Sequence, residues 1–310
     1  MLLELFRSFY IRQFPNDMEQ QIELFALFGG LGWEFNVDED LHSIIKNLIL
    51  ENYGTLYNQI LDSTLDEPRY HRLLTAFARG DRRLLSAFKR ARLSEVQGGD
   101  ALRFLKDNGI ISIEKSREAP PVRLYKGQQL KRSVARHRIS HKVRFKTPFL
   151  RFWFYFIDPF HEEITAGHFD PVLEYFSQHQ QSFYSFIFEE LSALLLQREF
   201  EGSITQIGSY WDAHVEIDIL AQDRSEHKIV GECKWTNHKV NKKELHKLHD
   251  KCLQAEIEPD ITVFFSKRGF SKELTQMAST SLYLYEAKDF VDLLQDVKEH
   301  EKIKGFELPA

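Results

Sequence analysis

The sequence contains little cysteine. Cys233 and Cys252 are the only two among 310 residues, and they form no CxxC pair. This usage indicates neither a disulfide framework nor a zinc ribbon. Few cysteines without such a framework are typical of a reducing compartment, so we expect the protein to be cytoplasmic.

Long apolar runs are also missing. The most apolar stretch, FLRFWFYFIDPF at residues 149–160, contains Arg151 and is shorter than the roughly 20 residues of a membrane-spanning helix. The opening MLLELFRSFYIRQF carries Arg7 and Arg12 and lacks a small-residue cleavage site, so we expect no signal peptide. Hydrophobic residues still make up 43% of the chain, 26 of them Phe, which indicates a globular protein with large cores and no membrane partner.

Several catalytic motifs are absent as well. No GxxxxGK[ST] loop occurs, so ATP is not an expected cofactor. His246 and His249 belong to no HExxH motif, and no Ser/His/Asp or Cys/His set indicates acyl transfer. The sequence therefore points away from P-loop ATPases, HExxH metalloproteases and triad hydrolases.

Positive charge is present but unevenly distributed. Residues 68–150 hold 21 Lys and Arg against 6 Asp and Glu, although the whole chain has a net charge of −5. A basic segment inside an acidic protein is typical of a polyanion-binding region, and we expect the polyanion to be DNA. The alternative is that this basic surface docks onto the acidic part of the same chain or of a neighbouring chain.

Residues 67–126 predict a winged helix-turn-helix. Amphipathic segments predict three short helices, and IISIEK and VRLYK then predict two strands around the basic tip SREAPP. Such a module places its third helix in the major groove and its wing on the DNA backbone. A winged helix that binds protein remains the alternative. The candidate DNA-binding residues in this region are Arg82, Arg83, Lys89, Arg90, Arg92, Arg103, Lys106, Lys115, Arg117 and Arg123.

Three further regions flank this module. Residues 1–66 predict helices, including an apolar stripe of Leu41, Ile44, Ile45 and Leu48. Residues 127–170 predict a basic linker, then a strand or two followed by an aromatic connecting helix. Residues 171–310 predict a helix, three strands, a helix and a further strand. We therefore expect a multi-domain protein with a C-terminal α/β domain and an α+β character over the whole chain.

One predicted hairpin, VEIDILAQDRSEHKIVGECKW at residues 215–235, concentrates acidic side chains. Because side chains alternate along a strand, Glu216 and Asp218 should share one face, and the other face should hold Val215, Ile217 and Ile219. Glu232 and Lys234 should likewise share a face, and pairing of the strands would let Asp218 meet Glu232. Two carboxylates and a backbone carbonyl suit Mg²⁺. A neighbouring lysine can orient or deprotonate an attacking water.

The alternative is a surface hairpin with salt-bridged charges. Against it, IVGECKW is otherwise apolar and is expected to be central in a sheet, where burying charge without a purpose is costly. Gly231 beside Glu232 permits close approach of a backbone or ligand. An acidic helix segment, FIFEELSALLL, also precedes the hairpin. These observations favour a metal site.

Asp218, followed fourteen residues later by Glu232-Cys233-Lys234 and preceded by a helix with Glu189, resembles the PD-(D/E)XK signature of restriction-endonuclease-like nucleases. A wider set of motifs is similar, in order, to the C-terminal half of archaeal-type AAA+ ATPases with the domain of unknown function 234 (DUF234): PRYHRLLTAFARGD, FLKDNGIIS, FLRFWFYFIDPF, FEELSALLL, IGSYWD, HVEIDILA and VGECKW. The resemblance covers roughly residues 20–290. It implies that the C-terminal domain is an α/β/α sandwich with a mixed central sheet.

Those relatives begin with a nucleotide-binding ATPase domain. Residues 22–60 resemble the helical lid that closes such ATPases, and no phosphate-binding loop accompanies them here. We therefore expect a relative that starts after the nucleotide-binding core and does not hydrolyse ATP.

The resemblance also implies roles for individual residues. Asp218, Glu232 and the backbone carbonyl of Cys233 would bind Mg²⁺, for which Mn²⁺ should substitute. Lys234 would act on the attacking water, and Glu189 matches the helix acid of the superfamily. Secondary candidates for these acidic positions are Glu190 and Glu216. The lysines after the second strand would hold a DNA strand, or would form an ordinary helix surface: Lys239, Lys242 and Lys243.

The sequence therefore predicts a DNA-binding, Mg²⁺-dependent deoxyribonuclease, with an endonuclease favoured over an exonuclease. One alternative is a non-catalytic DNA-binding regulator in which the nuclease-like domain is a scaffold. Another is an adaptor whose lid-like N-terminal region docks onto a separate AAA+ ATPase. Self-association is a further alternative.

Overall fold

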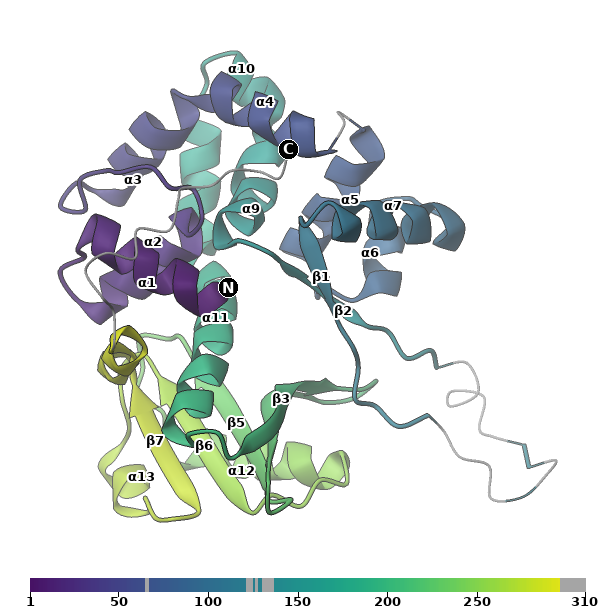
Figure 1. The fold of residues 1–310 in the computed structure, drawn as a ribbon, viewed down its shortest axis with the longest axis vertical. Helices are drawn as coiled ribbons and strands as arrows, with labels where there is room; N and C mark the ends of the chain where they lie inside the picture. Colours follow the sequence, from purple (N-terminus) through teal and green to yellow (C-terminus); the bar gives the residue numbers. More distant parts are fainter. Residues whose placement is uncertain (65–66, 121–124, 126–127, 130–136, 296–310) are drawn as a thin grey trace.

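The computed structural model describes the whole chain except residues 65–66, 121–124, 126–127, 130–136 and 296–310. Figure 1 shows a bundle of N-terminal and connecting helices, a smaller helical group beside it, and a sheet domain below. The long helix α11 (Asp170–Glu199) runs from the bundle down onto the sheet. Neither α11 nor any other helix in the described ranges is long and apolar enough to cross a membrane.

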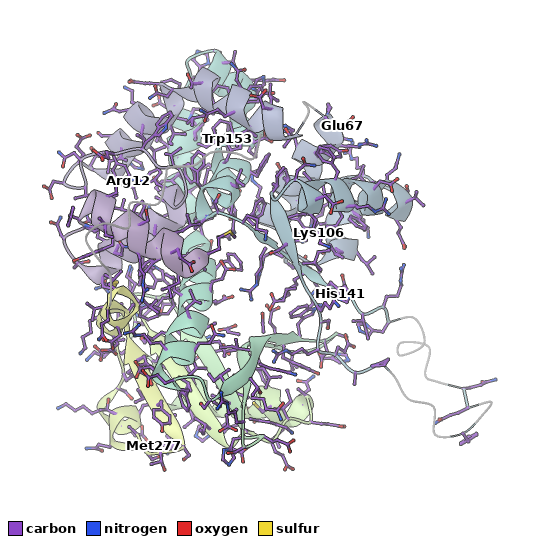
Figure 2. The ribbon with its side chains drawn as sticks, in the orientation of Figure 1. Arg12, Glu67, Lys106, His141, Trp153 and Met277 are labelled. Carbon is purple, nitrogen blue, oxygen red and sulfur yellow. The ribbon has the colours of Figure 1, made fainter. Side chains whose placement is uncertain are left out.

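The N-terminal helices and the aromatic connecting segment form one bundle. The N-terminal elements are α1 (Leu2–Gln13), α2 (Met18–Phe28), α3 (Leu41–Ile44), the π-helix η1 (Ile45–Leu50) and α4 (Tyr53–Thr64). The connecting elements are α9 (Pro148–Phe152), the π-helix η2 (Trp153–Ile157), the 3-10 helix η3 (Asp158–Phe160) and α10 (His161–Thr165). Trp153 lies inside this bundle in Figure 2 and stacks on Tyr53, with ring centroids 5.5 Å apart. The aromatic run therefore forms part of the core of this bundle, and its large rings supply buried area to that core.

The smaller helical group has the three helices expected from the amphipathic segments. They are α5 (Pro68–Arg79), α6 (Leu84–Arg90) and α7 (Glu95–Asp107). Leu73, Leu74 and Phe77 are fully buried on α5, which ends at Gly80. Ser94 begins α7 with a reciprocal capping box to Gln97, which satisfies two backbone donors at the helix start.

The strand that follows α7 pairs with a strand from the region expected to connect the helical group to the sheet domain. β1 (Ile111–Glu114) pairs antiparallel with β2 (Lys142–Phe145), and Arg83 forms an isolated bridge to Lys142. The expected partner, residues 122–126, lies outside the described residues apart from Tyr125. β2 fits as the partner because Val143 is fully buried and Phe145 nearly so. A strand assigned to the connecting region thus belongs beside the helical group. We call α5 through β2 the basic module.

The sheet domain follows the predicted order of a helix, three strands, a helix and a strand. After α11 come β3 (Ile204–Trp211), β4 (Glu216–Asp223), β5 (Lys228–Lys234), α12 (Lys242–Gln254), β6 (Ile261–Ser266), α13 (Lys272–Gln276), β7 (Leu282–Glu286) and the 3-10 helix η4 (Ala287–Leu294). The strand order is β3-β4-β5-β6-β7. The first three strands are antiparallel and the last three are parallel. This confirms an α/β protein with a mixed sheet.

The two faces of the sheet face different cores. Ile219, Ile229 and Val263 pack into the large core, which includes α11 and η4. Val230 and Phe264 pack into a second core with apolar residues of α12 and α13. Helices therefore cover both faces, which is why β5 and β6 are almost continuously apolar.

Removing the Phe188 ring should destabilise the region where α11 meets the sheet. Phe188 is fully buried, 4.7 Å from the Trp235 ring and 5.0 Å from the Phe290 ring. We expect Phe188→Ala to lower the free energy of unfolding by about 3–5 kcal/mol, because it leaves a cavity. Urea denaturation would measure this. Val96→Ala, at an exposed site on α7, should change the free energy of unfolding by less than about 0.5 kcal/mol. Equal effects of the two substitutions would contradict the assignment of Phe188 to the core.

Candidate active site

A β-bulge in β4 sets the geometry of the acidic hairpin. Gly208 pairs with Leu220, but Tyr210 pairs with Ile217, so β4 has one extra residue between these pairs. As a result, Ile217 packs into the second core while Ile219 packs into the large core. The expectation that Ile217 and Ile219 share a face is therefore wrong. Bulges interrupt the alternation of a strand and re-aim individual side chains, here at Asp218.

Asp218 lies where the hydrogen bonding between β4 and β5 ends. The last paired residues are Ile219 and Gly231, and the Asp218 carboxylate then accepts a hydrogen bond from the Cys233 backbone N–H at 2.8 Å. A Cβ on Gly231 would come within 3.1 Å of the Ile219 Cβ. The close approach that Gly231 permits is therefore made by a side chain of the paired strand.

Glu232 is buried, at 5% exposure, and two lysines neutralise it. Lys234 Nζ lies 2.7 Å from Glu232 Oε1, and Lys251 Nζ donates to both carboxylate oxygens at 2.9 and 2.8 Å. Burial lowers the pKa of Lys234, but Glu232 outweighs it and the net pKa is raised. Lys234 is therefore protonated at neutral pH and suited to orienting a water or phosphate, not to accepting a proton.

Sequence reasoning missed Lys251. It lies on α12 three residues after the buried Leu248 and directly before the buried Cys252. A lysine bordering the apolar stripe of a helix that covers the acidic strand is a signal that could have identified it. Its long side chain lets the ammonium reach Glu232 from the edge of that stripe.

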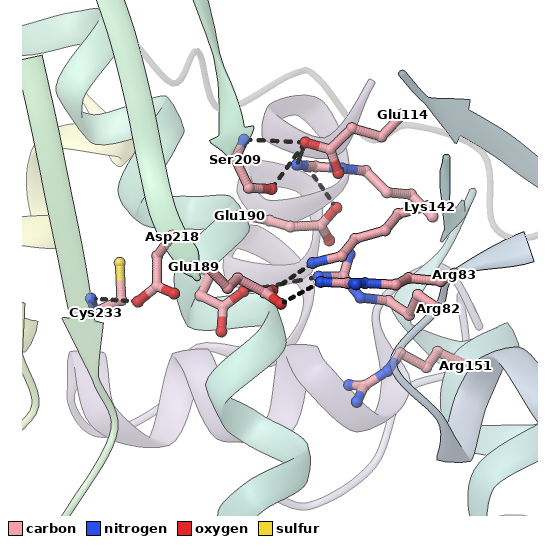
Figure 3. A network of polar contacts seen from close by, with 12 residues as sticks. Arg82, Arg83, Glu114, Lys142, Arg151, Glu189, Glu190, Ser209, Asp218 and Cys233 are labelled. Atoms are coloured by element: carbon pink, nitrogen blue, oxygen red, sulfur yellow. Dashed lines mark hydrogen bonds and ion pairs between the residues drawn. The ribbon is translucent and has the colours of Figure 1, made fainter. Parts of the chain in front are cut away.

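Glu189, on α11, completes an acidic cluster with Asp218 and Glu232. Burial raises the pKa of Glu189 to about 7, although Arg82 opposes this shift. The pKa of Asp218 is also raised, first by burial and then by the charges of Glu189 and Glu232. Figure 3 shows Asp218 and Glu189 side by side. Buried carboxylates that repel one another would be stabilised by a cation between them.

The donor chemistry suits Mg²⁺, but the acids do not converge on one position. Carboxylate oxygens are the preferred Mg²⁺ ligands. Within the described ranges, however, no group of three or more His, Cys, Asp or Glu side chains is arranged to hold a metal ion. Glu232 is engaged by lysines, and Glu189 lies 3.9 Å from Arg82. Both acids are therefore paired with cationic side chains in this structure.

The basic module supplies several of these cations. Arg82 is 8% exposed, and its guanidinium lies 3.9 Å from the centre of the Phe186 ring as well as near Glu189. Glu216, a secondary candidate, forms ion pairs with Lys142 and, at 3.8 Å, with Arg83. Figure 3 shows the side chains of Arg82, Arg83 and Lys142 directed toward the side on which Glu189 lies.

A second network holds the other secondary candidate, Glu190. Arg144 lies between Glu190, at 3.0 Å, and Glu114, at 2.9 Å. Glu114 also accepts hydrogen bonds from the backbone N–H and the hydroxyl of Ser209. Burial opposes the charge of Glu114, but Arg144 and Ser209 outweigh it and lower the pKa to about 2. Glu190 therefore serves an ion-pair network beside Glu189.

The candidate DNA-binding residues separate into two sets. Arg82, Arg83 and Arg117 make internal contacts, and Arg117 donates to the Leu220 carbonyl at 2.7 Å. Lys242 is ion-paired with Glu273 at 3.2 Å. Arg123 lies outside the described residues. The exposed set is Lys89, Arg90, Arg92, Arg103, Lys106, Lys115, Lys239 and Lys243. One part of the basic segment thus docks onto the acidic part of the same chain, and another part faces outward.

Glu114→Gln should lower the free energy of unfolding by an amount that depends on pH. Because the folded-state pKa lies below the unfolded value, Glu114 stabilises the protein above about pH 4.5 and loses that effect as pH falls toward about 2. We expect Glu114→Gln to cost about 2–3 kcal/mol at pH 7. Urea denaturation at several pH values would show the difference shrinking with acidification. Glu273→Gln, at an exposed ion pair, should have little effect. A pH-independent loss in Glu114→Gln would contradict this explanation.

Comparison with known proteins supports one part of the resemblance found in the sequence. Residues 153–248 match the model of DUF234, a family described as archaea bacterial proteins of unknown function. No curated protein and no solved structure matches the chain. The matched segment runs from η2 into α12 and includes Glu189, the bulged strand β4, and β5. The acidic cluster therefore lies within the part of the chain that matches DUF234.

Proposed function

We propose that this protein binds DNA and hydrolyses phosphodiester bonds with Mg²⁺ at the cluster of Asp218, Glu189 and Glu232. The observation that carries this proposal is the raised pKa of two neighbouring, partly buried acids, Asp218 and Glu189, where the β4–β5 pairing ends. Buried groups with strongly shifted pKa values concentrate at functional sites, because isolated buried charge is otherwise unfavourable.

The arrangement of elements supports the same proposal. The order α11-β3-β4-β5-α12-β6 in a mixed sheet is the arrangement implied by the PD-(D/E)XK resemblance. The order α5-α6-α7-β1-β2, with Arg83 bridged to β2, agrees with a winged helix. We therefore assign the sheet domain as nuclease-like and the basic module as a winged helix.

The residues of the site have distinct roles in this reaction. Asp218, Glu232 and the Cys233 carbonyl would hold Mg²⁺, which would polarise the phosphate and lower the pKa of a bound water. The Cys233 N–H fixes the Asp218 carboxylate, and Lys251 orients Glu232. Protonated Lys234 would orient the attacking water and offset the charge that develops on the phosphate.

The outward face of α6 and α7 is proposed to bind DNA. Arg103 is 73% exposed and pairs only loosely with Asp100, at 3.3 Å. Lys106 is also exposed, and Figure 2 shows it on the helical group, far from Met277 of the sheet domain. Exposed Lys and Arg on the third helix can neutralise phosphates in a groove without first breaking internal contacts.

A second candidate function is a non-catalytic DNA-binding regulator, or an adaptor for a separate AAA+ ATPase. The observation that favours it is the pairing of Glu232 with Lys234 and Lys251, which satisfies this acid without a metal ion. In that case the winged helix would carry the activity, and the sheet domain would be a scaffold.

Asp218→Asn and Lys234→Met should each reduce the rate of DNA cleavage by at least about 100-fold, because each removes a charge required for the reaction at the phosphate. Plasmid and single-stranded DNA with Mg²⁺ or Mn²⁺ would provide the assay. Lys228→Met, at an exposed site on the same strand, is the matched control and should cleave normally. Cleavage that survives Asp218→Asn would refute the assignment. A wild-type protein that binds DNA but never cuts would favour the regulator.

Arg103→Ala and Lys106→Ala should weaken DNA binding and reduce its salt dependence. Each lost phosphate contact should lower the slope of log K against log [salt] by about 1. Fluorescence anisotropy at several salt concentrations would measure the slope. Lys272→Ala, at an exposed lysine on α13, should leave both quantities unchanged. Equal slopes in all variants would exclude α7 from the DNA interface.

A further inference from the structure

We propose that the basic module closes the acidic site: Arg82, Arg83 and Lys142 act as built-in counterions of Glu189 and Glu216, and Arg82 excludes a divalent metal ion until the module separates from the sheet domain. This inference rests on the proposed function, because it concerns metal binding at the same acids. It adds a regulated state to that function.

The cations of the basic module lie next to the acids. Arg82 Nη2 lies 3.9 Å from Glu189 Oε2, and Glu189 adjoins Asp218. Arg83 and Lys142 hold Glu216, two residues before Asp218 on the same strand. A guanidinium beside Glu189 both neutralises the acid and repels an incoming Mg²⁺, which must displace such neighbours to bind carboxylate oxygens at about 2.1 Å.

Arg82 has an unfavourable backbone conformation. Its φ of 63° lies in the left-handed region, which is unfavourable for a residue with a Cβ. Glycine would fit this position without strain. The conformation directs an almost fully buried arginine at the acidic cluster, so its side-chain contacts must offset the backbone strain.

The contact between the basic module and the acidic cluster is incompletely hydrogen-bonded. Arg82 Nη1 and Arg151 Nε are buried and have no hydrogen-bond partner within the described part of the chain. Arg151 lies against the same Phe186 ring as Arg82, at 4.7 Å. Burial, and then the charge of Arg82, lowers the pKa of Arg151 to about 9. Crowded cations with unsatisfied donors make the closed contact less favourable than its ion pairs alone would suggest.

The module is also anchored to the sheet domain away from the acids. Trp211 Nε1 donates to the Ser140 carbonyl at 2.8 Å, and Arg117 donates to the Leu220 carbonyl at 2.7 Å. These contacts join the module to β3 and β4 without touching the acidic cluster. They involve none of the cations at the cluster.

The test is the affinity of the whole chain for Mn²⁺, measured by calorimetry without DNA. Arg82→Gly removes the cation and relieves the backbone, and should tighten Mn²⁺ binding by about tenfold or more. The matched control is Arg92→Gly, which replaces an exposed arginine of the same module that also has a positive φ, 56°. It should bind Mn²⁺ as the wild type does.

A second variant guards against a folding defect in Arg82→Gly. Arg83→Ala, at a side chain that is about a quarter exposed, should tighten Mn²⁺ binding in the same direction by a smaller factor. Adding Asp218→Asn to Arg82→Gly should abolish the gain. A gain that survives Asp218→Asn would overturn the inference, because the ion would then bind elsewhere.

The remaining outcomes separate this inference from the proposed function. Equal Mn²⁺ affinity in the wild type, Arg82→Gly and Arg83→Ala would overturn closure of the site but leave a metal-dependent nuclease intact. Absence of Mn²⁺ binding in all of these variants would overturn both.

Discussion

The structure depends on the neutralisation of acidic side chains that are wholly or partly buried where α11 meets the sheet. Glu189, Glu190, Asp218 and Glu232 lie in surroundings where isolated charge is unfavourable, so each needs a hydrogen-bond donor or a cation. The cations come from distant parts of the sequence, with Arg82 and Arg144 from the basic module and Lys251 from α12. Their pairing joins the module to the sheet domain.

This constraint explains the uneven charge of the chain. The basic segment 68–150 compensates acids elsewhere in the same molecule, and within the described residues part of its surplus is exposed on α6 and α7. A region can thus be basic for two physical reasons. Inward-facing arginines form ion pairs in a medium of low polarity, where pairing is strong and removal of one partner is costly. Outward-facing lysines and arginines are screened by salt and remain available for a polyanion.

The bulge in β4 relates the fold to the candidate chemistry. A regular strand would carry Ile217 and Ile219 on one face, and its ladder with β5 would continue past Ile219. The extra residue ends the ladder and leaves the Asp218 carboxylate to accept the Cys233 N–H. The acidic cluster therefore forms at a point of local irregularity, where side chains from a strand and from α11 converge. A regulated nuclease and an inactive scaffold differ in whether these acids exchange their cationic side chains for a metal ion.

The sequence by itself determined the features that depend on local periodicity. Apolar spacing predicted α5, alternation predicted β4 and β5, and the order of elements predicted the mixed α/β domain that carries Asp218 and Glu232. Only the tertiary structure decided which side chains meet. It paired β1 with β2, introduced the bulge, brought Lys251 to Glu232 and turned Arg82 inward. The reason is physical: helix and strand periodicity involve near neighbours, whereas strand partners and buried ion pairs depend on residues that are far apart in the sequence.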